Sequence, residues 1–349
     1  MASGLDFART FGTYLLQRNL QHLIIHVTNH CNFRCEHCFI DFSPKKDLKL
    51  PQFQEIARQV GPLFWLDIAG GEPSLRKDLA DIVAAFDAKV VQIPSNGSLP
   101  DLLIPALERI KKLTKAEVAV SFSLDGLPDT HEKVRGAPGN WQQVWDCYEK
   151  VLEVGGIAVK INTCLTNHNV DEIIPLMKLV RAKGVDFHSI ILLRGDPLDA
   201  SVALPPTDVL ERLAPAMFEI LGTYDYGRNY LAARVLRNYH KLLWKTSLRT
   251  IEEHRQVTPC YAGKFHMVVM GDGRVSSCEM LEAVGNVKTQ SWTEIMQSQA
   301  YRDQVASIER GECHCTHNCA MMGSLLFNPK HAAKLAFGVD IPNPAKAAV

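Results

Sequence analysis

The sequence predicts an α/β protein, with a parallel sheet of successive βα units followed by a small cysteine-rich module near the carboxyl end. Two observations predict the sheet. Short runs rich in Val and Ile alternate with amphipathic segments of helical length, and the runs are largely apolar, as strands buried on both faces require. A third observation predicts the module, because eight of the ten cysteines fall in two local groups, unlike a framework of scattered disulfides.

Six strands are expected, each separated from the next by a segment long enough for a helix. They cover residues 23–27, 64–70, 89–95, 118–126, 158–166 and 187–195. Apolar residues recur at helical spacing between them, for example at Leu103, Leu107 and Ile110. After about residue 200 only the helical spacing continues, which indicates a change of architecture.

From Cys260 onward the pattern changes again. Two short strand-like runs flank Gly271-Asp272-Gly273, which predicts a hairpin because glycine adopts positive φ at little cost. The expected organisation is a helical segment at 1–22, a core at 23–200, a helical linker at 201–254, an auxiliary domain at 255–325 and a tail at 326–349.

The charge balance disfavours some classes of partner. Lys plus Arg and Asp plus Glu each number 38, so no overall positive field attracts nucleic acid or an anionic membrane. No apolar run reaches the roughly 18 to 20 residues of a membrane span, and the first residues lack the pattern of a secretory signal. We expect a cytoplasmic protein that binds neither membrane nor nucleic acid.

The first cysteine group, Cys31, Cys35 and Cys38, follows the first expected strand with the spacing C-x3-C-x2-C. The loop therefore lies at the carboxyl end of a strand, where α/β proteins place their active sites. Three thiolates can hold three irons of a 4Fe–4S cluster and leave the fourth iron open to a small molecule. A zinc site is the alternative, and it requires a fourth ligand from His30 or His37.

This loop and the tetrapeptide Gly70-Gly71-Glu72-Pro73 after the second strand together resemble the radical S-adenosylmethionine (radical SAM) superfamily. The resemblance implies a partial (β/α)6 TIM-like barrel. It also implies that S-adenosylmethionine chelates the open iron and is cleaved by one electron to a 5′-deoxyadenosyl radical, which abstracts a substrate hydrogen. An electron donor such as flavodoxin or ferredoxin is implied as a partner.

Further cofactor contacts follow from the same resemblance. Gly70, Gly71 and Glu72 would hold the methionine end of the cofactor, because glycines allow close backbone approach and their carbonyls can accept from its ammonium group. The other positions that resemble cofactor contacts are Ser95, Asn96, Ser123, Asp125, Asn162 and Arg135, the last placed to pair with the cofactor carboxylate. Turn and capping roles are the alternative for the Ser, Asn and Asp positions, and a solvated loop residue is the alternative for Arg135.

The second cysteine group consists of Cys260, Cys278, Cys313, Cys315 and Cys319. It resembles the twitch and SPASM extensions of radical SAM enzymes, with Cys278 near a Gly285-Asn286 pair. Five cysteines suffice for one fully ligated auxiliary 4Fe–4S cluster with one thiol to spare, which favours the shorter twitch form.

Spacing does not decide which of the five thiols is spare, although Cys313 and Cys315 lie only one residue apart. We expect Cys260, Cys278 and Cys319 to be ligands. Structural zinc held by four cysteines is the alternative for this module.

The function that these motifs imply is a radical SAM enzyme of oxidoreductase type. Only about 22 residues precede the first strand, which favours oxidation or rearrangement of a small-molecule or sugar-like metabolite over recognition of a peptide. The alternatives are a peptide-modifying maturase that forms crosslinks or epimerises residues, a metal-stabilised binding scaffold, and an electron carrier.

Overall fold

The structure is a computed structural model that describes residues 9–14, 19–43 and 45–338. Its described strands form a nine-stranded sheet in the order β6-β5-β4-β3-β2-β1-β7-β8-β9. The strands are β1 (His22–Thr28), β2 (Leu63–Gly70), β3 (Ala88–Ser95), β4 (Glu117–Ser123), β5 (Ala158–Leu165), β6 (Phe187–Leu192), β7 (His266–Val269), β8 (Arg274–Ser276) and β9 (Gly285–Asn286). The first six occupy the six predicted segments and pair in parallel, so the predicted α/β fold is confirmed.

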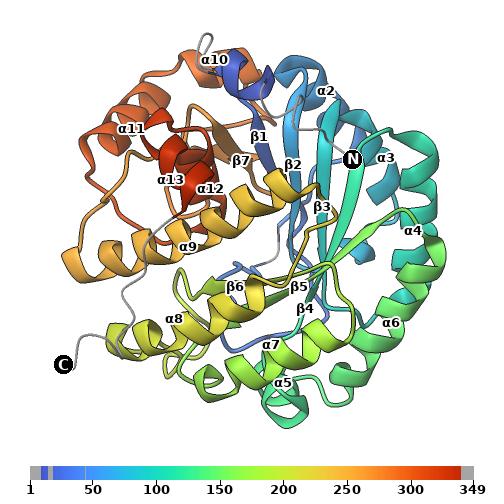
Figure 1. The fold of residues 1–349 in the computed structure, drawn as a ribbon. Coiled ribbons are helices and arrows are strands. Elements are labelled where there is room, and N and C mark those ends of the chain that lie inside the picture. The colour runs from blue at the N-terminus through green and yellow to red at the C-terminus, as the bar shows by residue number, and fades with distance from the viewer. Residues whose placement is uncertain (1–8, 15–18, 44, 339–349) are drawn as a thin grey trace.

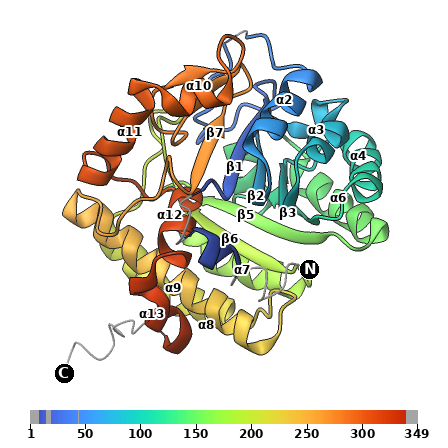
Figure 2. The ribbon, with the colours of Figure 1, turned by 90° about the horizontal axis from the view of Figure 1, so that it is seen from above.

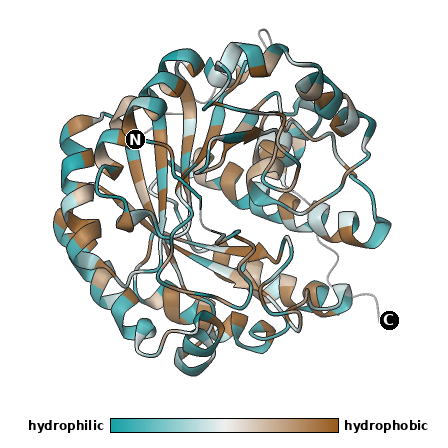
Figure 3. Ribbon diagram, turned by 180° about the vertical axis from the view of Figure 1, so that it is seen from behind, coloured by the Kyte–Doolittle hydropathy of each residue, from teal (hydrophilic) through white to brown (hydrophobic). Residues whose placement is uncertain are grey.

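Helices cover the outer face of the curved sheet (Figures 1 and 2). They are α2 (Leu50–Val60), α3 (Leu79–Ala85), α4 (Pro100–Leu113), α5 (Pro128–Arg135), α6 (Asn140–Val154) and α7 (Ile173–Ala182), with short 3-10 turns at Pro73–Leu75, Val170–Glu172 and Pro329–His331. Pro100 and Pro128 begin their helices, where the missing N–H costs nothing. Figure 3 shows hydrophilic residues on the outer sides of these helices.

The main hydrophobic core lies between the outer face of the sheet and these helices. Alternate residues of each strand point into it, for example Val118, Val120 and Phe122 of β4. The intervening residues point to the inner face, and on β5 these are Lys160 and Asn162. The inner face is therefore polar where the outer face is apolar.

The C-terminal region is continuous with the barrel sheet. Strand β7 pairs in parallel with β1, with His22 opposite His266, and the predicted hairpin then adds β8 and β9 in antiparallel pairing. The sequence predicts a separate small module, but hydrogen bonding joins its hairpin to the edge strand of the barrel. At the hairpin, Gly285 allows close packing, because a Cβ there would lie 2.7 Å from Ile295.

Six further α-helices follow β6 in the described part of the chain. They are α8 (Thr207–Leu221), α9 (Tyr230–Glu253), α10 (Trp292–Gln297), α11 (Gln299–Arg310), α12 (Asn318–Leu326) and α13 (Ala332–Phe337). Helix α9 stacks His240 on Phe187 of β6, with ring centroids 4.6 Å apart, and packs Leu242 into a cluster with Phe265 beside β7.

Helix α13 lies within the stretch predicted as a tail and packs on α9, where Asn238 Nδ2 donates to the Leu335 carbonyl at 2.8 Å. The expected loose end at 340–349 lies outside the described residues, as do 1–8 and 15–18 of the predicted helical segment. Among the described helices, none has both the length and the apolar composition needed to cross a membrane.

Candidate functional site

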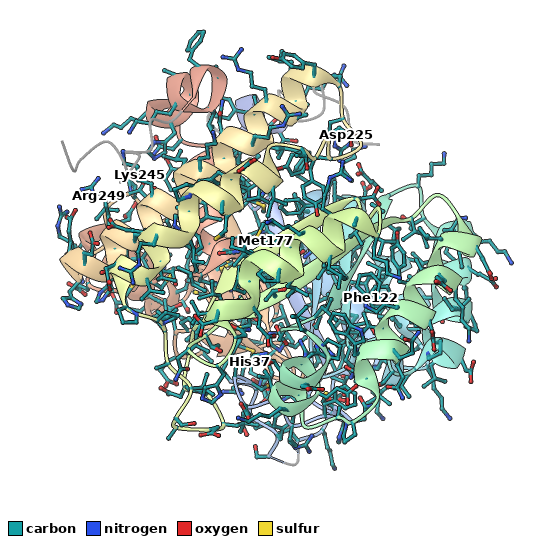
Figure 4. The ribbon with its side chains drawn as sticks, turned by 60° about the horizontal axis from the view of Figure 1, so that its bottom comes forward. His37, Phe122, Met177, Asp225, Lys245 and Arg249 are labelled. Atoms are coloured by element: carbon teal, nitrogen blue, oxygen red, sulfur yellow. The ribbon has the colours of Figure 1, made fainter. Side chains whose placement is uncertain are left out.

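The first cysteine loop lies at the carboxyl end of β1, at the end of the molecule where Figure 4 labels His37. A turn joins Cys38 N to the Cys35 carbonyl at 3.0 Å, and Glu36 N donates to the Val134 carbonyl at 2.9 Å, which anchors the loop to α5. Cys35 is buried, whereas Cys31 and Cys38 are half-buried. The loop therefore presents three thiols from one short anchored segment.

These thiols fit a cluster site chemically. Burial raises the pKa of Cys31 and Cys38, and it raises the pKa of Cys35 to about 11. The Arg135 guanidinium opposes this shift, and its Nη1 lies 3.6 Å from Cys35 Sγ. Buried thiols of this kind become thiolates only when a strong positive charge such as iron binds them.

The Gly70-Gly71 pair packs against this loop. A Cβ on Gly70, whose φ is +115°, would lie 2.1 Å from the Thr28 carbonyl oxygen, and one on Gly71 would lie 2.0 Å from that of His30. The resemblance implies that these glycines allow close approach of a cofactor. The structure gives a different reason, because the chain's own backbone occupies the space that a side chain would need.

Glu72 is part of a buried network and not a free group. It is 2% exposed and accepts hydrogen bonds from Ser74, from Ser95 Oγ at 3.0 Å and from Asn96 N at 2.8 Å. Burial raises the pKa of Glu72, and the donors of Asn96 and Ser74 oppose that shift. Three predicted cofactor contacts, Glu72, Ser95 and Asn96, thus bind one another and fix the ends of β2 and β3 side by side.

Arg135 and Asp125 form a second buried pair. Arg135 Nε donates to Asp125 Oδ2 at 2.7 Å and Nη2 lies 2.6 Å from the same oxygen, while Cys164 N donates to Oδ1 at 2.8 Å. Burial would lower the pKa of Arg135, but the Asp125 carboxylate outweighs it and the pKa is raised. The expectation was that Arg135 pairs with a cofactor carboxylate. In the structure its partners are Asp125 and Cys35.

Ser123 and Asn162 differ from these residues. They are opposite each other in the β4–β5 register, both half-buried on the inner face. Among the described residues, neither side chain takes part in a hydrogen bond. These two predicted contacts are therefore the ones with free polar groups in the barrel interior.

Four of the five C-terminal cysteines lie together. Cys278 packs in one apolar cluster with Cys260 and Cys313. Burial raises the pKa of Cys278, of Cys313 and of Cys260. The neighbouring Cys315 thiol raises each of these pKa values further, and at Cys260 a backbone hydrogen bond opposes the shift.

Cys319 has a different neighbour. It is on α12 and its Sγ is 3.7 Å from Asp67 Oδ2 on the inner face of β2. Cys319 is among the expected ligands, and spacing does not decide whether Cys313 and Cys315 both contribute. In the structure Cys313 and Cys315 both act on Cys260, while Cys319 on α12 lies beside Asp67, and the choice of ligands stays a prediction.

Among the described residues, no three His, Cys, Asp or Glu side chains converge on a point where a single metal ion could bind.

Sequence reasoning missed a set of charged and histidine side chains inside the barrel. Asp67 accepts from Trp65 Nε1 at 2.7 Å and lies 2.9 Å from His22 Nε2. Lys160 Nζ donates to Gln92 at 2.9 Å. The signal was present, because charged residues interrupt strands that are otherwise apolar.

A second missed cluster lies beside the auxiliary cysteines. Glu279, which directly follows Cys278, is 2.9 Å from His26 Nε2 and 2.7 Å from His317 Nε2. Arg194 Nη2, just beyond β6, is 3.6 Å from Glu279. The histidines that contact Glu279 come from elements far apart in the chain.

Comparisons with known proteins agree with this geometry. A family model described as the Radical SAM superfamily matches residues 25–180, and one described as SPASM, an iron–sulfur cluster-binding domain, matches 260–320. Together they cover more than half of the chain.

The chain is 33% identical over 161 residues to an S-adenosylmethionine-dependent nucleotide dehydratase of Selenomonas ruminantium, covering 42% of this chain and 57% of the dehydratase. It is 27% identical over 293 residues to an AdoMet-dependent heme synthase of Methanosarcina barkeri, covering 78% of this chain and 80% of the synthase. The match to the dehydratase thus spans little more than half of that relative.

The fold is similar to that of Streptococcus suis SuiB, with a TM-score of 0.62 at 18% identity over 88% of this chain and 72% of SuiB. SuiB bound to its precursor peptide SuiA gives a TM-score of 0.61 at 17% identity, covering 86% of this chain and 71% of that one. This likeness concerns the fold alone.

Proposed function

This chain belongs to the radical SAM superfamily and carries a SPASM domain, and we propose that it oxidises or rearranges a small polar metabolite. Its radical SAM domain binds a 4Fe–4S cluster and S-adenosylmethionine, and its SPASM domain binds auxiliary iron–sulfur cofactor. When bound, these groups supply one-electron cleavage of S-adenosylmethionine and abstraction of a substrate hydrogen atom.

The observation that carries the proposal is the three-thiol loop packed against Gly70-Gly71 at the carboxyl end of the sheet. In this assignment Cys31, Cys35 and Cys38 hold the reducing cluster. Ser123 and Asn162 offer free polar groups to the adenosyl part of the cofactor. Five other predicted contacts act indirectly on the cofactor, because they hold the strand ends and the loop in register. They are Glu72, Ser95, Asn96, Asp125 and Arg135.

Cys260, Cys278, Cys313 and Cys315 would hold one auxiliary 4Fe–4S cluster, because these four thiols lie together. Full ligation by four cysteines leaves no open iron, so this cluster would transfer electrons or stabilise the domain but would not bind substrate. Reduced flavodoxin or ferredoxin would supply the electron for the first cluster.

The polarity of the barrel interior supports a polar substrate. His266 on β7 is fully buried, and neither ring nitrogen has a hydrogen-bond partner among the described residues. Lys160 has Gln92 as its hydrogen-bond partner and lies in the same interior. Buried polar groups without partners are costly, and a bound polar molecule or ordered water would satisfy them.

The names of two relatives support a metabolite as the substrate, since one is a nucleotide dehydratase and the other a heme synthase. Peptide modification is the second candidate, and the similarity of the fold to SuiB with its bound precursor peptide supports it.

The test is conversion of S-adenosylmethionine to 5′-deoxyadenosine by anaerobically reconstituted, dithionite-reduced protein. We expect conversion by the wild type and by Cys147→Ala, a buried helical cysteine outside both groups, and none by Cys35→Ala. Conversion that survives Cys35→Ala would refute the assignment. Stimulation by a filtered metabolite extract, and not by a peptide fraction, would support the metabolite over the peptide.

A further inference from the structure

One side chain touches both cysteine regions. Arg194 follows β6, and its guanidinium carbon lies 5.0 Å from the ring centroid of Phe39, the residue directly after Cys38. Its Nη2 lies 3.6 Å from Oε2 of Glu279, the residue directly after Cys278. A single cation thus lies between the loop of the first group and the strand end of the second.

The backbone holds this cation in place. Gly195 has φ of +70°, and a Cβ there would lie 2.8 Å from Phe39 Cβ and 3.3 Å from Met280 Cε. Only glycine suits that conformation and that space. The chain after β6 therefore lies in close contact with both cysteine regions, and this packing restricts the movement of Arg194 away from either.

The charge of Arg194 is only partly compensated. Its side chain is 22% exposed, and its Nε is buried without a hydrogen-bond partner among the described residues. Glu279 is its one ion-pair partner there within 4.0 Å, and it also faces His26 and His317.

The field of this cation reaches thiols of both groups. Burial raises the pKa of Cys38 and of Cys315. At Cys38 the cations that oppose this shift are Arg135, Arg34 and Arg194 in decreasing order, and at Cys315 the opposing cation is Arg194. Of the charges that act on Cys315, Arg194 is the principal cation.

We propose that Arg194 is a shared positioning residue that raises the reduction potentials of both iron–sulfur clusters. This inference rests on the proposed function, which places one cluster at each cysteine group. Adding an electron makes a cluster more negative, and a fixed neighbouring cation in a region of low dielectric constant stabilises that reduced state. Arg194 itself neither gains nor loses an electron or a proton.

The experiment is a redox titration of the reconstituted full chain, monitored by electron paramagnetic resonance, which distinguishes the clusters. The variants are Arg194→Gln, which removes the charge, and Arg194→Lys, which keeps it. The control is Arg212→Gln on α8, where the arginine is 63% exposed and pairs with Asp208. We expect both midpoint potentials to fall in Arg194→Gln, by about tenfold in each reduction equilibrium or about 59 mV. They should change little in Arg194→Lys and not at all in the control.

Unchanged potentials in Arg194→Gln with full iron content would overturn the inference. A shift at one cluster alone would overturn the shared role. If Arg194→Gln loses iron, Glu279→Gln decides the matter, because removing the carboxylate beside Cys278 must then raise the auxiliary potential. No rise would refute the electrostatic argument. Wild-type protein without two clusters would refute the proposed function itself, whereas two clusters insensitive to Arg194 would refute this inference alone.

Discussion

The two cysteine regions are assembled in different ways. Cys31, Cys35 and Cys38 come from one loop of eight residues that follows a strand. The thiols of the second region come from three places in the chain, which are the segment before β7, the residues directly after β8 and the loop before α12. The first region is therefore a local structure that the sequence displays directly, and the second exists only after β7 has paired with β1 and α12 has packed on α9.

The difference shows in which residues surround each site. The first region is supported by contacts near the ends of adjacent strands, such as Glu72 with Asn96. The second is supported by long-range contacts such as Glu279 with His26. Substitutions in the first region should remove chemistry directly, whereas those in the second should act through the assembly of the domain.

The largest expected effect is the loss of iron from the first region while the second region keeps its iron. We expect the Cys31→Ala/Cys35→Ala/Cys38→Ala variant to fall from about eight irons to about four and to lose all cleavage of S-adenosylmethionine. Iron and sulfide assays with product chromatography measure both. Zinc that replaces iron in the second region would contradict the comparison, since that region would then be structural.

Within the second region, the structure distinguishes Cys315 from Cys319. We expect Cys315→Ala to lose about four irons, because its thiol lies with the three others, and Cys319→Ala to lose none. The two variants are matched in chemistry and lie in the same short segment, so each is the control for the other. Equal iron loss in both would show that α12 rotates to bring Cys319 to the cluster.

The buried pair of the first region should make a large contribution to stability. Asp125→Asn leaves the Arg135 cation in a buried position without its carboxylate, which costs about 3–5 kcal/mol in the free energy of unfolding. Urea denaturation measures this cost. Asp208→Asn at an exposed pair is the control, and it should change stability by less than about 1 kcal/mol. Similar costs for both would mean that the buried pair is as well solvated as the surface one.

The glycine contacts of the first region predict a smaller effect. Gly71→Ala places a Cβ against the His30 carbonyl and should destabilise the protein by about 1–3 kcal/mol while loosening the cysteine loop. Gly12→Ala is the control, because nothing lies within 4 Å of a Cβ there. Thermal unfolding of both variants measures the difference, and an unchanged Gly71→Ala would place the cysteine loop farther from β2 than the structure does.

The last expected effect is a pH dependence. Burial lowers the pKa of His131 to about 4, and its Nδ1 accepts a hydrogen bond from Asp125 N only when neutral. The unfolded chain therefore binds a proton more readily, so stability is present above the unfolded value near 6.5 and is lost as pH falls toward about 4. The slope from this group is at most about 1.4 kcal/mol per pH unit. His131→Gln should flatten the curve of unfolding free energy against pH in that window, and an unaltered curve would show that His131 is protonated in the fold.

Local sequence patterns are enough to predict the six-strand α/β core, the first cysteine group and the presence of a second one. These follow from local patterns, because strand alternation, helical spacing and a three-cysteine loop are each complete within a few residues. The cofactor contacts were only partly predictable. Polar residues at strand ends were visible, but Glu72 and Arg135 could not be recognised from sequence as groups that bind Asn96 and Asp125.

How the second region joins the first depends on contacts between distant parts of the chain. The pairing of β7 with β1 brings Glu279 to His26, across 253 residues of sequence. Helix α12 places Cys319 beside Asp67 of β2. Such contacts depend on the sum of many weak packing interactions along the chain, and no short pattern of residues encodes them.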